Sequence, residues 1–295
     1  GTASALPKCS IRPISISKGV FVLPGTLYLV ATPIGNLDDV SLRLIKTLND
    51  CEIIACEDTR HTLKLLNHLK LKKKLISYHE HNEQQRTQEL ISLLENGHNI
   101  ALVSDAGMPL ISDPGAVILT KARELNINVT VIPGPNAALC ALVLSGMDCS
   151  RFVFEGFLPV KGKERIVRLE ALAKETRTSI LYESPHRLEQ TIQQLSEYCE
   201  GRELALIREL TKLHEECSKI TLSPDMSLFS PENPPRGEYV LVLQGAYNVI
   251  KYPRDIKEHV LTLMQSGMDK KEAVKTAARQ RGVSKDVIYK ECLEL

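Results

Sequence analysis

The sequence predicts an α/β protein whose mostly parallel strands end in ligand-binding loops. Three apolar segments are each followed at once by a loop rich in glycine and proline and then by a helical pattern: residues 26–32, 99–104 and 128–132. If these strands are parallel, the loops meet at the carboxyl edge of one sheet, where open α/β folds bind ligands. A chain of 295 residues is long enough for two such domains.

The first domain is predicted over residues 24–135. Its first strand is expected to be buried on both faces, because nearly every residue of the run is apolar or β-branched. Pro33 ends the run, and Gly35 permits a turn before a helix that should begin near Asp38 or Asp39. A further strand is expected at residues 51–56. The alternating pattern then predicts helices at about 39–49, 59–69, 82–96 and 115–126. None of the loops has the spacing of a dinucleotide or P-loop motif.

A second α/β domain is predicted over residues 136–246, with Asn136 placed to cap its first helix. Apolar runs predict its strands at 151–155, 178–182, 203–208 and 239–243, with helices near 163–174 and 185–199. Residues 252–295 form a small helical extension that resembles a helix-turn-helix. In it, Asp269 and Glu272 make a capping box, and Gly282 ends the helix. This extension either binds RNA or packs on its own protein.

The composition limits the class of protein. Hydrophobic residues make up 43% of the chain, yet no apolar run approaches the roughly 20 residues that span a membrane. The net charge of +1 means that any basic surface must be local. Eight cysteines without a CxxC pair indicate a reducing compartment and no zinc site, and we expect Cys51, Cys56 and Cys140 to be buried.

The first residues, 1–23, contain Lys8, Arg12 and Lys18 and no acidic residue before Asp38. A basic, serine-rich and acid-free leader is typical of organellar transit peptides, and a disordered tail is the alternative. The expected location is an organelle, with the plastid stroma favoured over the mitochondrial matrix or the cytoplasm.

Six unusual motifs occur in an order that resembles a known family. The family is that of the small-subunit ribosomal RNA 2′-O-ribose methyltransferases of the tetrapyrrole-methylase superfamily. The motifs are ATPIGNLDD (31–39), CEDTR (56–60), SYHEHNE (77–83), SDAGMPLISDPG (104–115), IPGPNA (132–137) and PRGEYVLV (235–242). The resemblance implies two α/β domains with the cofactor S-adenosylmethionine in the cleft between them, a homodimer, and methylation of a cytidine in the decoding region of small-subunit rRNA.

The resemblance also implies which residues bind the cofactor. They are Pro33, Asp105, Ala106, Gly107, Met108, Leu110, Asn136, Ala137, Leu181 and Tyr182. Glycine and proline allow the backbone to approach a ligand closely. Asp105 can accept hydrogen bonds from the amino group or the ribose hydroxyls of the cofactor.

The acceptor side is expected at the second and third strands. Glu80, Asp58 and His79 are unranked candidates for the proton acceptor. The candidates for contact with small-subunit rRNA, or with an assembling subunit, are Arg60, Lys72, Lys73, Lys74 and Arg187. A second basic cluster spans residues 151–168, although either cluster could be an ordinary solvated face. His79 and His81 have metal-like spacing, but no third ligand is near, and we expect no metal.

Two other functions remain open at this point. One is methylation of a small tetrapyrrole intermediate on the same fold, which the basic clusters and the SYHEHNE and CEDTR motifs disfavour. The other is a non-catalytic RNA-binding protein with a vestigial cofactor cleft, against which the intact Asp105, Gly107 and Gly134 argue.

Overall fold

The computed structural model describes residues 23–224, 226–230, 232, 234–246, 253 and 255–292. Residues 1–22 of the predicted leader lie outside this range. The chain divides after Ala246 into two compact units, and each is described by itself.

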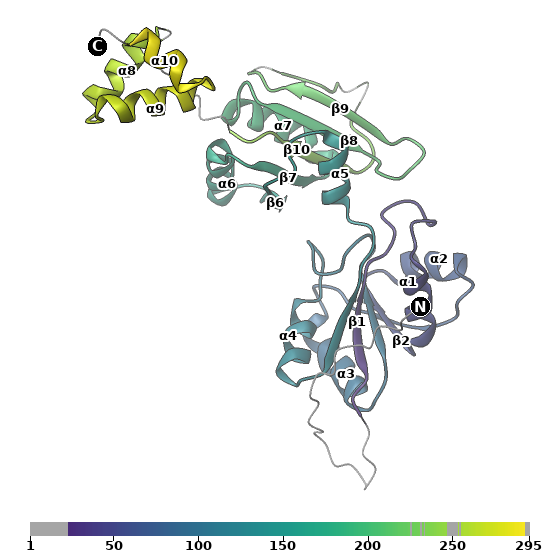
Figure 1. The fold of residues 1–295 in the computed structure, drawn as a ribbon. Helices are drawn as coiled ribbons and strands as arrows, with labels where there is room; N and C mark the ends of the chain where they lie inside the picture. Colours follow the sequence, from purple (N-terminus) through teal and green to yellow (C-terminus); the bar gives the residue numbers. More distant parts are fainter. Residues whose placement is uncertain are drawn as a thin grey trace. The chain divides into compact units, whose positions relative to one another are not determined.

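The first sheet confirms the predicted parallel arrangement (Figure 1). Its strands lie in the order β3-β2-β4-β1-β5 and pair in parallel: β1 (Thr26–Val30), β2 (Ile53–Cys56), β3 (Lys74–Ser77), β4 (Ile100–Val103) and β5 (Asn128–Ile132). The loops after β1, β4 and β5 therefore share one edge of the sheet, as the sequence predicts.

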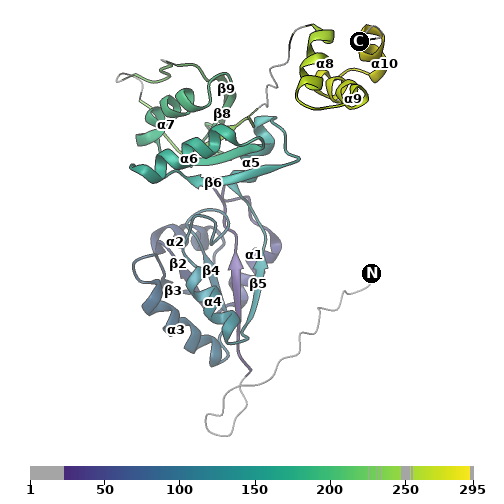
Figure 2. The same cartoon turned by 90° about the vertical axis from the view of Figure 1, so that its left-hand side faces the viewer.

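Helices cover both faces of this sheet (Figures 1 and 2). Leu27 and Leu29 pack with α3 (Glu83–Glu95) and α4 (Ala116–Glu124), whereas Val30 packs with α1 (Leu42–Asp50) and α2 (Thr59–His68). Successive residues of β1 thus enter opposite cores, because side chains alternate along a strand.

The second sheet has the order β6-β7-β10-β8-β9, and in it only β6 and β7 pair in parallel among the described strands. The strands are β6 (Phe152–Phe157), β7 (Thr178–Glu183), β8 (Glu203–Arg208), β9 (Glu216–Thr221) and β10 (Tyr239–Leu243). One face packs against α6 (Lys163–Lys174) and α7 (Pro185–Tyr198), and the other against α5 (Ala137–Ser145). Ile34, from the loop after β1, enters the α5 core and ties the two sheets together.

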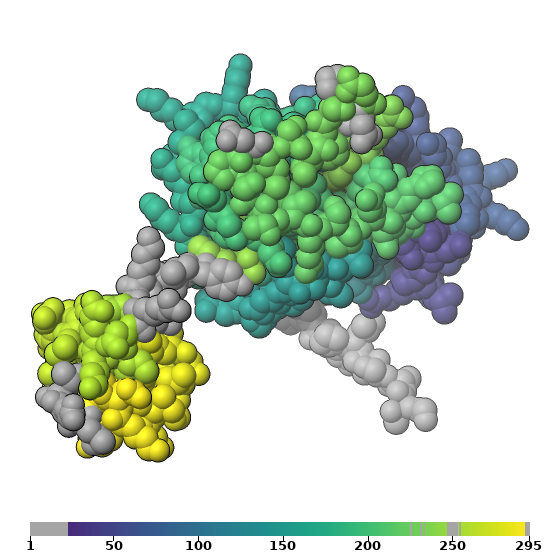
Figure 3. Space-filling view, turned by 90° about the horizontal axis from the view of Figure 1, so that it is seen from above, coloured from purple at the N-terminus to yellow at the C-terminus, as the bar shows by residue number. Residues whose placement is uncertain are grey.

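The C-terminal unit contains α8 (Ile256–Gln265), α9 (Lys270–Arg281) and α10 (Lys285–Glu291) (Figures 1 and 2), packed around a core of their own. Figure 3 shows the surface of this unit in yellow-green and yellow. Asp269 accepts a hydrogen bond from the Glu272 amide at 2.8 Å, and Gly282 ends α9 in the left-handed conformation. These two predicted helix ends are confirmed. The sequence analysis did not predict α8.

Several predicted details are wrong. Helix α1 begins at Leu42 rather than near Asp38, because Ser41 accepts the Leu44 amide at 3.0 Å and caps it. Cys51 and Cys56 are buried as expected, but Cys140 is exposed on the outer side of α5. The two sheet-edge strands β3 and β9 were missed. Both carry charged, exposed residues, which is one way in which natural edge strands avoid pairing with other chains.

Candidate functional site

Two loops at the carboxyl edge of the first sheet are joined by backbone hydrogen bonds. Thr32 and Gly107 exchange amide-to-carbonyl bonds of 2.9 and 3.0 Å, and the Thr32 hydroxyl donates to the Ser104 carbonyl. Gly107 has a φ of +80°, and a Cβ there would lie 3.2 Å from Ile34. The position therefore requires glycine, because a side chain would be strained and would crowd the loop after β1.

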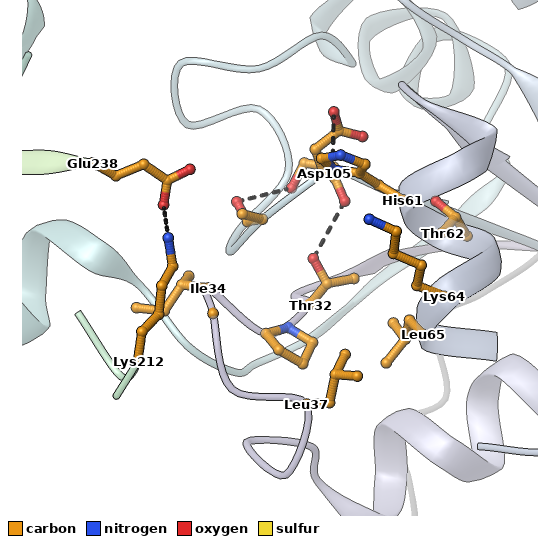
Figure 4. Close-up of a pocket in the computed structure, with 14 residues that line it drawn as sticks. Thr32, Ile34, Leu37, His61, Thr62, Lys64, Leu65, Asp105, Lys212 and Glu238 are labelled. Atoms are coloured by element: carbon orange, nitrogen blue, oxygen red, sulfur yellow. Dashed lines mark hydrogen bonds and ion pairs between the residues drawn. The ribbon is translucent and has the colours of Figure 1, made fainter. Parts of the chain in front are cut away.

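Two adjoining pockets open at this edge. We call the first the α2 pocket, because His61, Lys64 and Leu65 of helix α2 form one wall (Figure 4). Its other walls come from the loop after β1, the loop after β4 and the second sheet: residues 32–35, Leu37, Ser104, Asp105, Ala106, Lys212 and Glu238.

We call the second the Tyr182 pocket. Its lining includes Glu57, residues 105–108, Ile111, Ser112, Asp113, Asn136, Ala137, Phe157, residues 182–185 and residues 238–240. Ile34, Asp105, Ala106 and Glu238 border both pockets. The two pockets therefore share a wall, and Asp105 lies in it.

Seven of the ten predicted cofactor residues line the Tyr182 pocket: Asp105, Ala106, Gly107, Met108, Asn136, Ala137 and Tyr182. Pro33 lines the α2 pocket instead. Asn136 also caps α5 as predicted, accepting the Leu139 amide at 3.0 Å. The Leu181 side chain is buried in the second-sheet core, and that of Leu110 packs against the first, so neither side chain reaches the pocket. Both side chains are used in packing, so contact of these two leucines with the cofactor stays a prediction that concerns their backbone groups.

Five carboxylate side chains line the Tyr182 pocket. Glu183 is bound to Arg187 and Glu238 to Lys212, which leaves Glu57, Asp105 and Asp113 as its acidic group. Burial, reinforced by the charge of Asp105, raises the pKa of Glu57. Burial, reinforced by Glu57, raises the pKa of Asp113 to about 6. Such an arrangement favours a cationic ligand, because a positive charge would relieve the repulsion among the carboxylates.

Tyr182 brings an aromatic wall to the same pocket. Its ring meets Phe154 and Phe157 edge-on, with centroids 5.1 and 5.6 Å apart. Phe157 and Tyr182 line the pocket together with Val240. Aromatic and apolar side chains beside carboxylates suit a ligand with a flat ring and a charged portion.

Asp105 is held in place from two sides. Its Oδ1 accepts the Asp58 amide at 2.9 Å, and its Oδ2 lies 3.8 Å from His61 Nδ1. The first contact connects the loop after β4 with the loop after β2. Asp105 therefore presents its carboxylate at a defined position between the pockets.

The three predicted proton acceptors lie outside both pockets. Asp58 caps α2 and binds the Arg60 guanidinium, whose hydrogen bonds hold the pKa of that carboxyl well below its usual range. A carboxylate so stabilised is a poor base. His79 and Glu80 follow β3, the edge strand, and Glu80 is exposed. The strand order thus leaves the dense SYHEHNE cluster outside the lining of both pockets, although His79 and Glu80 are near enough to Glu57 to affect its pKa.

His79 has its own local contacts. Its Nε2 lies 3.1 Å from the Asn82 side chain, and its buried Nδ1 has no hydrogen-bond partner among the described residues. Within the same range, no group of three or more histidine, cysteine, aspartate or glutamate side chains is placed to hold a metal ion.

Two of the predicted RNA-binding residues have internal partners. Arg187 donates to Glu183, which is almost fully buried, and to the Leu158 carbonyl, so its guanidinium already has partners within the protein and its contact with an rRNA phosphate stays a prediction. Lys73 donates to the carbonyls of Asn49 and Cys51 at the end of α1. Arg60 is exposed beside Asp58, and Lys72 and Lys74 are exposed, so for these three the RNA contact stays a prediction.

The second basic cluster is divided: Arg151, Lys161 and Lys163 are exposed, whereas its other two basic residues have internal partners. Arg165 is buried and donates to Gln194, Thr191 and the Pro159 carbonyl, whereas Arg168 pairs with Glu155. A guanidinium group has five N–H donors, and in Arg165 and Arg168 several of these donors are bound to groups within the protein.

We expect Lys73→Ala to lower the free energy of unfolding by about 1 kcal/mol, because two helix-end carbonyls lose a charged donor. Lys72→Ala is the matched control, since its side chain is exposed, and its effect should stay within about 0.5 kcal/mol. Urea denaturation of both variants measures the difference. If Lys73→Ala and Lys72→Ala were equally stable and bound RNA equally weakly, the result would favour a phosphate contact for Lys73 instead.

Sequence reasoning missed His61, Lys64, Asp113, Lys212 and Glu238 as pocket residues. His61 and Lys64 follow the CEDTR motif at helical spacing, so a helix-face argument could have found them. No motif or helical spacing in the sequence points to Lys212. Its ammonium binds Glu209 and Glu238 at 2.9 and 2.8 Å, and its stem packs so closely on Gly35 that a Cβ there would clash.

The chain combines a parallel sheet, with two pockets at its carboxyl edge, and a second, mixed sheet. This is a two-domain enzyme fold of the tetrapyrrole (corrin/porphyrin) methylase type, and the model of that family matches residues 26–224. The protein "Ribosomal RNA small subunit methyltransferase I" of Synechocystis sp. is 45% identical, over 92% of this chain and 98% of that one. The protein of the same name from Bacillus subtilis is 44% identical, over 90% and 93%. The chain belongs to this methyltransferase family.

A solved structure with the same fold is uroporphyrin-III C-methyl transferase from Thermus thermophilus complexed with S-adenyl homocysteine. It has a TM-score of 0.52 and 13% identity, and covers 75% of this chain and 97% of that one. The predicted fold class is therefore confirmed.

Proposed function

We propose that this protein is an S-adenosylmethionine-dependent methyltransferase that modifies the ribose 2′-hydroxyl of a cytidine in the decoding region of small-subunit rRNA. The single observation that carries the proposal is the pair of pockets sharing the Asp105 wall. A transfer reaction between two bound molecules needs two sites that meet, and family membership supports rRNA as the acceptor.

The Tyr182 pocket fits the cofactor. S-adenosylmethionine supplies a methyl group already activated by a positively charged sulfonium. Glu57, Asp105 and Asp113 provide the negative charge that attracts this cation, and Tyr182 with Phe157 provides an apolar wall for the adenine ring. The protein's main task is to align the acceptor with the methyl group, because positioning alone supplies several kcal/mol of a transfer barrier.

Radiolabelled methyl transfer tests this function. The protein is incubated with tritiated S-adenosylmethionine and either small ribosomal subunits lacking the modification or a tetrapyrrole precursor. We expect label in the rRNA alone. Label in the tetrapyrrole alone would favour the small-molecule alternative. A calorimetric titration without detectable cofactor binding would favour the vestigial, non-catalytic alternative.

We further infer that the protein is a homodimer. Helix α5 exposes an unusual run of apolar side chains, including Leu139, Val143 and Leu144, although its inner face is already buried. Exposed apolar patches of this kind typically mark association surfaces. A two-fold dimer would bury the same patch on both copies.

We expect Val143→Asp to convert the dimer into a monomer of 32.9 kDa, because the side chain is 73% exposed and the substitution should not disturb the fold. Light scattering at micromolar concentration gives the mass. Leu42→Asp, at an even more exposed apolar residue of α1, is the control and should remain dimeric. A wild-type protein that scatters as a monomer would contradict the inference.

The leader composition supports import into an organelle, and we propose the plastid stroma. Residues 1–23 fused to a fluorescent reporter test this, with mitochondrial or cytoplasmic fluorescence as the contrary result.

A further inference from the structure

We propose that the α2 pocket receives the acceptor nucleotide and that His61, with Asp105 behind it, accepts the proton of the attacking ribose hydroxyl. This inference rests on the proposed function, which it deepens by assigning the acceptor site and the base. The assignment of His61 does not come from the motifs discussed above, since His61 lies immediately after CEDTR.

The geometry joins a histidine and a carboxylate at the boundary of the two pockets. His61 Nδ1 lies 3.8 Å from Asp105 Oδ2, and both residues line the α2 pocket (Figure 4). Asp105 also lines the Tyr182 pocket, where the cofactor is proposed to bind. With Nδ1 directed to Asp105, Nε2 is the nitrogen left to take a proton. Such contacts are often long in the absence of substrate and shorten when it binds.

His61 is better placed than the other titratable groups. Glu80, Asp58 and His79 do not line either pocket. Glu57, Asp113 and Glu183 line only the Tyr182 pocket, and Glu238 is bound to Lys212. Imidazole is also the side chain that most often accepts protons near neutral pH.

Lys64 supplies a cation for the acceptor's phosphate. It lies three residues after His61, so both side chains project from the same side of α2 and line the pocket. Among the residues that the structure describes, Lys64 makes no ion pair, whereas Lys212 on the opposite wall is bound to two carboxylates. An ammonium without a carboxylate partner can bind a phosphate at little cost.

The remaining walls suit a nucleoside. Pro33, Leu37 and Leu65 provide apolar surface for a base or sugar, and the Asp105 and Glu238 carboxylates can accept from hydroxyl or amino groups. The pocket thus offers apolar, cationic and acceptor groups together, which is the set that a single nucleotide requires.

The proposed step is balanced. The hydroxyl oxygen forms a bond to the methyl carbon while the carbon–sulfur bond breaks, and that electron pair remains on sulfur as the neutral thioether. The hydroxyl proton moves to His61 Nε2, and Asp105 stabilises the resulting imidazolium before the proton leaves to solvent. The other charged groups around His61 are Asp58, Arg60 and Lys64 on its own side and Lys212 and Glu238 across the pocket.

The test compares His61→Gln with His68→Gln in the full-length protein. His68 lies on the same helix, is partly exposed and pairs with Asp38 outside the pocket. Single-turnover methylation of small ribosomal subunits is followed as pH is varied. At saturating S-adenosylmethionine, we expect His61→Gln to be about 100-fold slower and to lack the decline in rate on acidification that is expected of the wild type. Its affinity for S-adenosylmethionine, measured by calorimetry, should stay within about twofold, and His68→Gln should match the wild type.

Lys64→Ala tests the acceptor pocket without relying on turnover. Filter binding to the small subunit should weaken about tenfold and become less dependent on salt, with unchanged cofactor affinity. Lys70→Ala, at an exposed lysine just beyond α2, is the control. A His61→Gln protein with wild-type rate and pH profile, or unchanged binding by Lys64→Ala, would overturn the inference. A wild type that methylates no small-subunit rRNA would instead overturn the proposed function.

Discussion

Replacing Asp105 by alanine is expected to weaken S-adenosylmethionine binding at least tenfold, about 1.4 kcal/mol. The carboxylate lies in the wall shared by the two pockets and is about one-third exposed, so it can contact the cofactor directly. Its removal takes one negative charge from a site proposed to bind a sulfonium. Calorimetric titration of wild type and variant gives the two dissociation constants.

Asp105→Asn tests the charge of Asp105 separately from its hydrogen bond to the Asp58 amide. Asparagine can still accept the Asp58 amide that Asp105 Oδ1 accepts at 2.9 Å, but it carries no charge. We expect weakened cofactor binding with an intact fold in this variant. A folded Asp105→Ala protein with unchanged affinity would remove Asp105 from the cofactor site.

The second large effect is expected at Asp113, whose pKa is raised to about 6 by burial and by the neighbouring Glu57. Above this pH the carboxylate is ionised and attracts the sulfonium; below it the group is neutral. Cofactor affinity should therefore fall as the pH decreases through about 6. In Asp113→Asn the affinity should be lower and should lack this dependence. Titrations at several pH values reveal either pattern, and an equal pH dependence in both proteins would contradict the role of Asp113.

The same residue should reduce the stability of the protein without cofactor. Its pKa in the folded state lies above its ordinary value of 3.8, so folding favours the protonated form. The contribution to stability is present below about pH 4 and is lost as the pH rises through about 6. Above that pH, Asp113→Asn should stabilise the fold by up to about 3 kcal/mol. Denaturation at about pH 8 measures this, and a variant no more stable than the wild type would contradict it. Asp113 would then lower the free energy of unfolding while it raises the affinity for the cofactor.

The loops that form the pockets were predictable because their signals are local. Apolar strands followed by glycine and proline mark the ends of β1, β4 and β5, and parallel pairing brings those ends together. Gly107 and Asn136 have local roles, in a left-handed turn and a helix cap, that short motifs reveal.

The order of strands was not predictable in the same way. The SYHEHNE cluster is the densest polar segment, yet β3 lies at the edge of the sheet and carries His79 and Glu80 away from the pockets. Lys212 and Glu238 reach the α2 pocket from the second domain through contacts between residues distant in sequence. No local pattern encodes such an arrangement.

Charge counting was the least reliable guide. Arg165 and Arg168 belong to a basic cluster in the sequence, and Arg187 is a separate predicted phosphate contact. All three bind internal carbonyl, hydroxyl or carboxylate groups in the structure. A charge in a sequence reveals neither its partner nor its burial. Lys64, within the other basic stretch, instead lines a pocket.

The most direct test of the central claim is the position of the methyl group on the rRNA. Primer extension at low deoxynucleotide concentration stops at a 2′-O-methylated ribose. We predict a stop at one cytidine of the decoding region in small-subunit rRNA from wild-type cells. It should be absent from cells lacking this protein and restored by the intact protein but not by Asp105→Ala. Persistence of that stop in the cells lacking the protein would contradict the account.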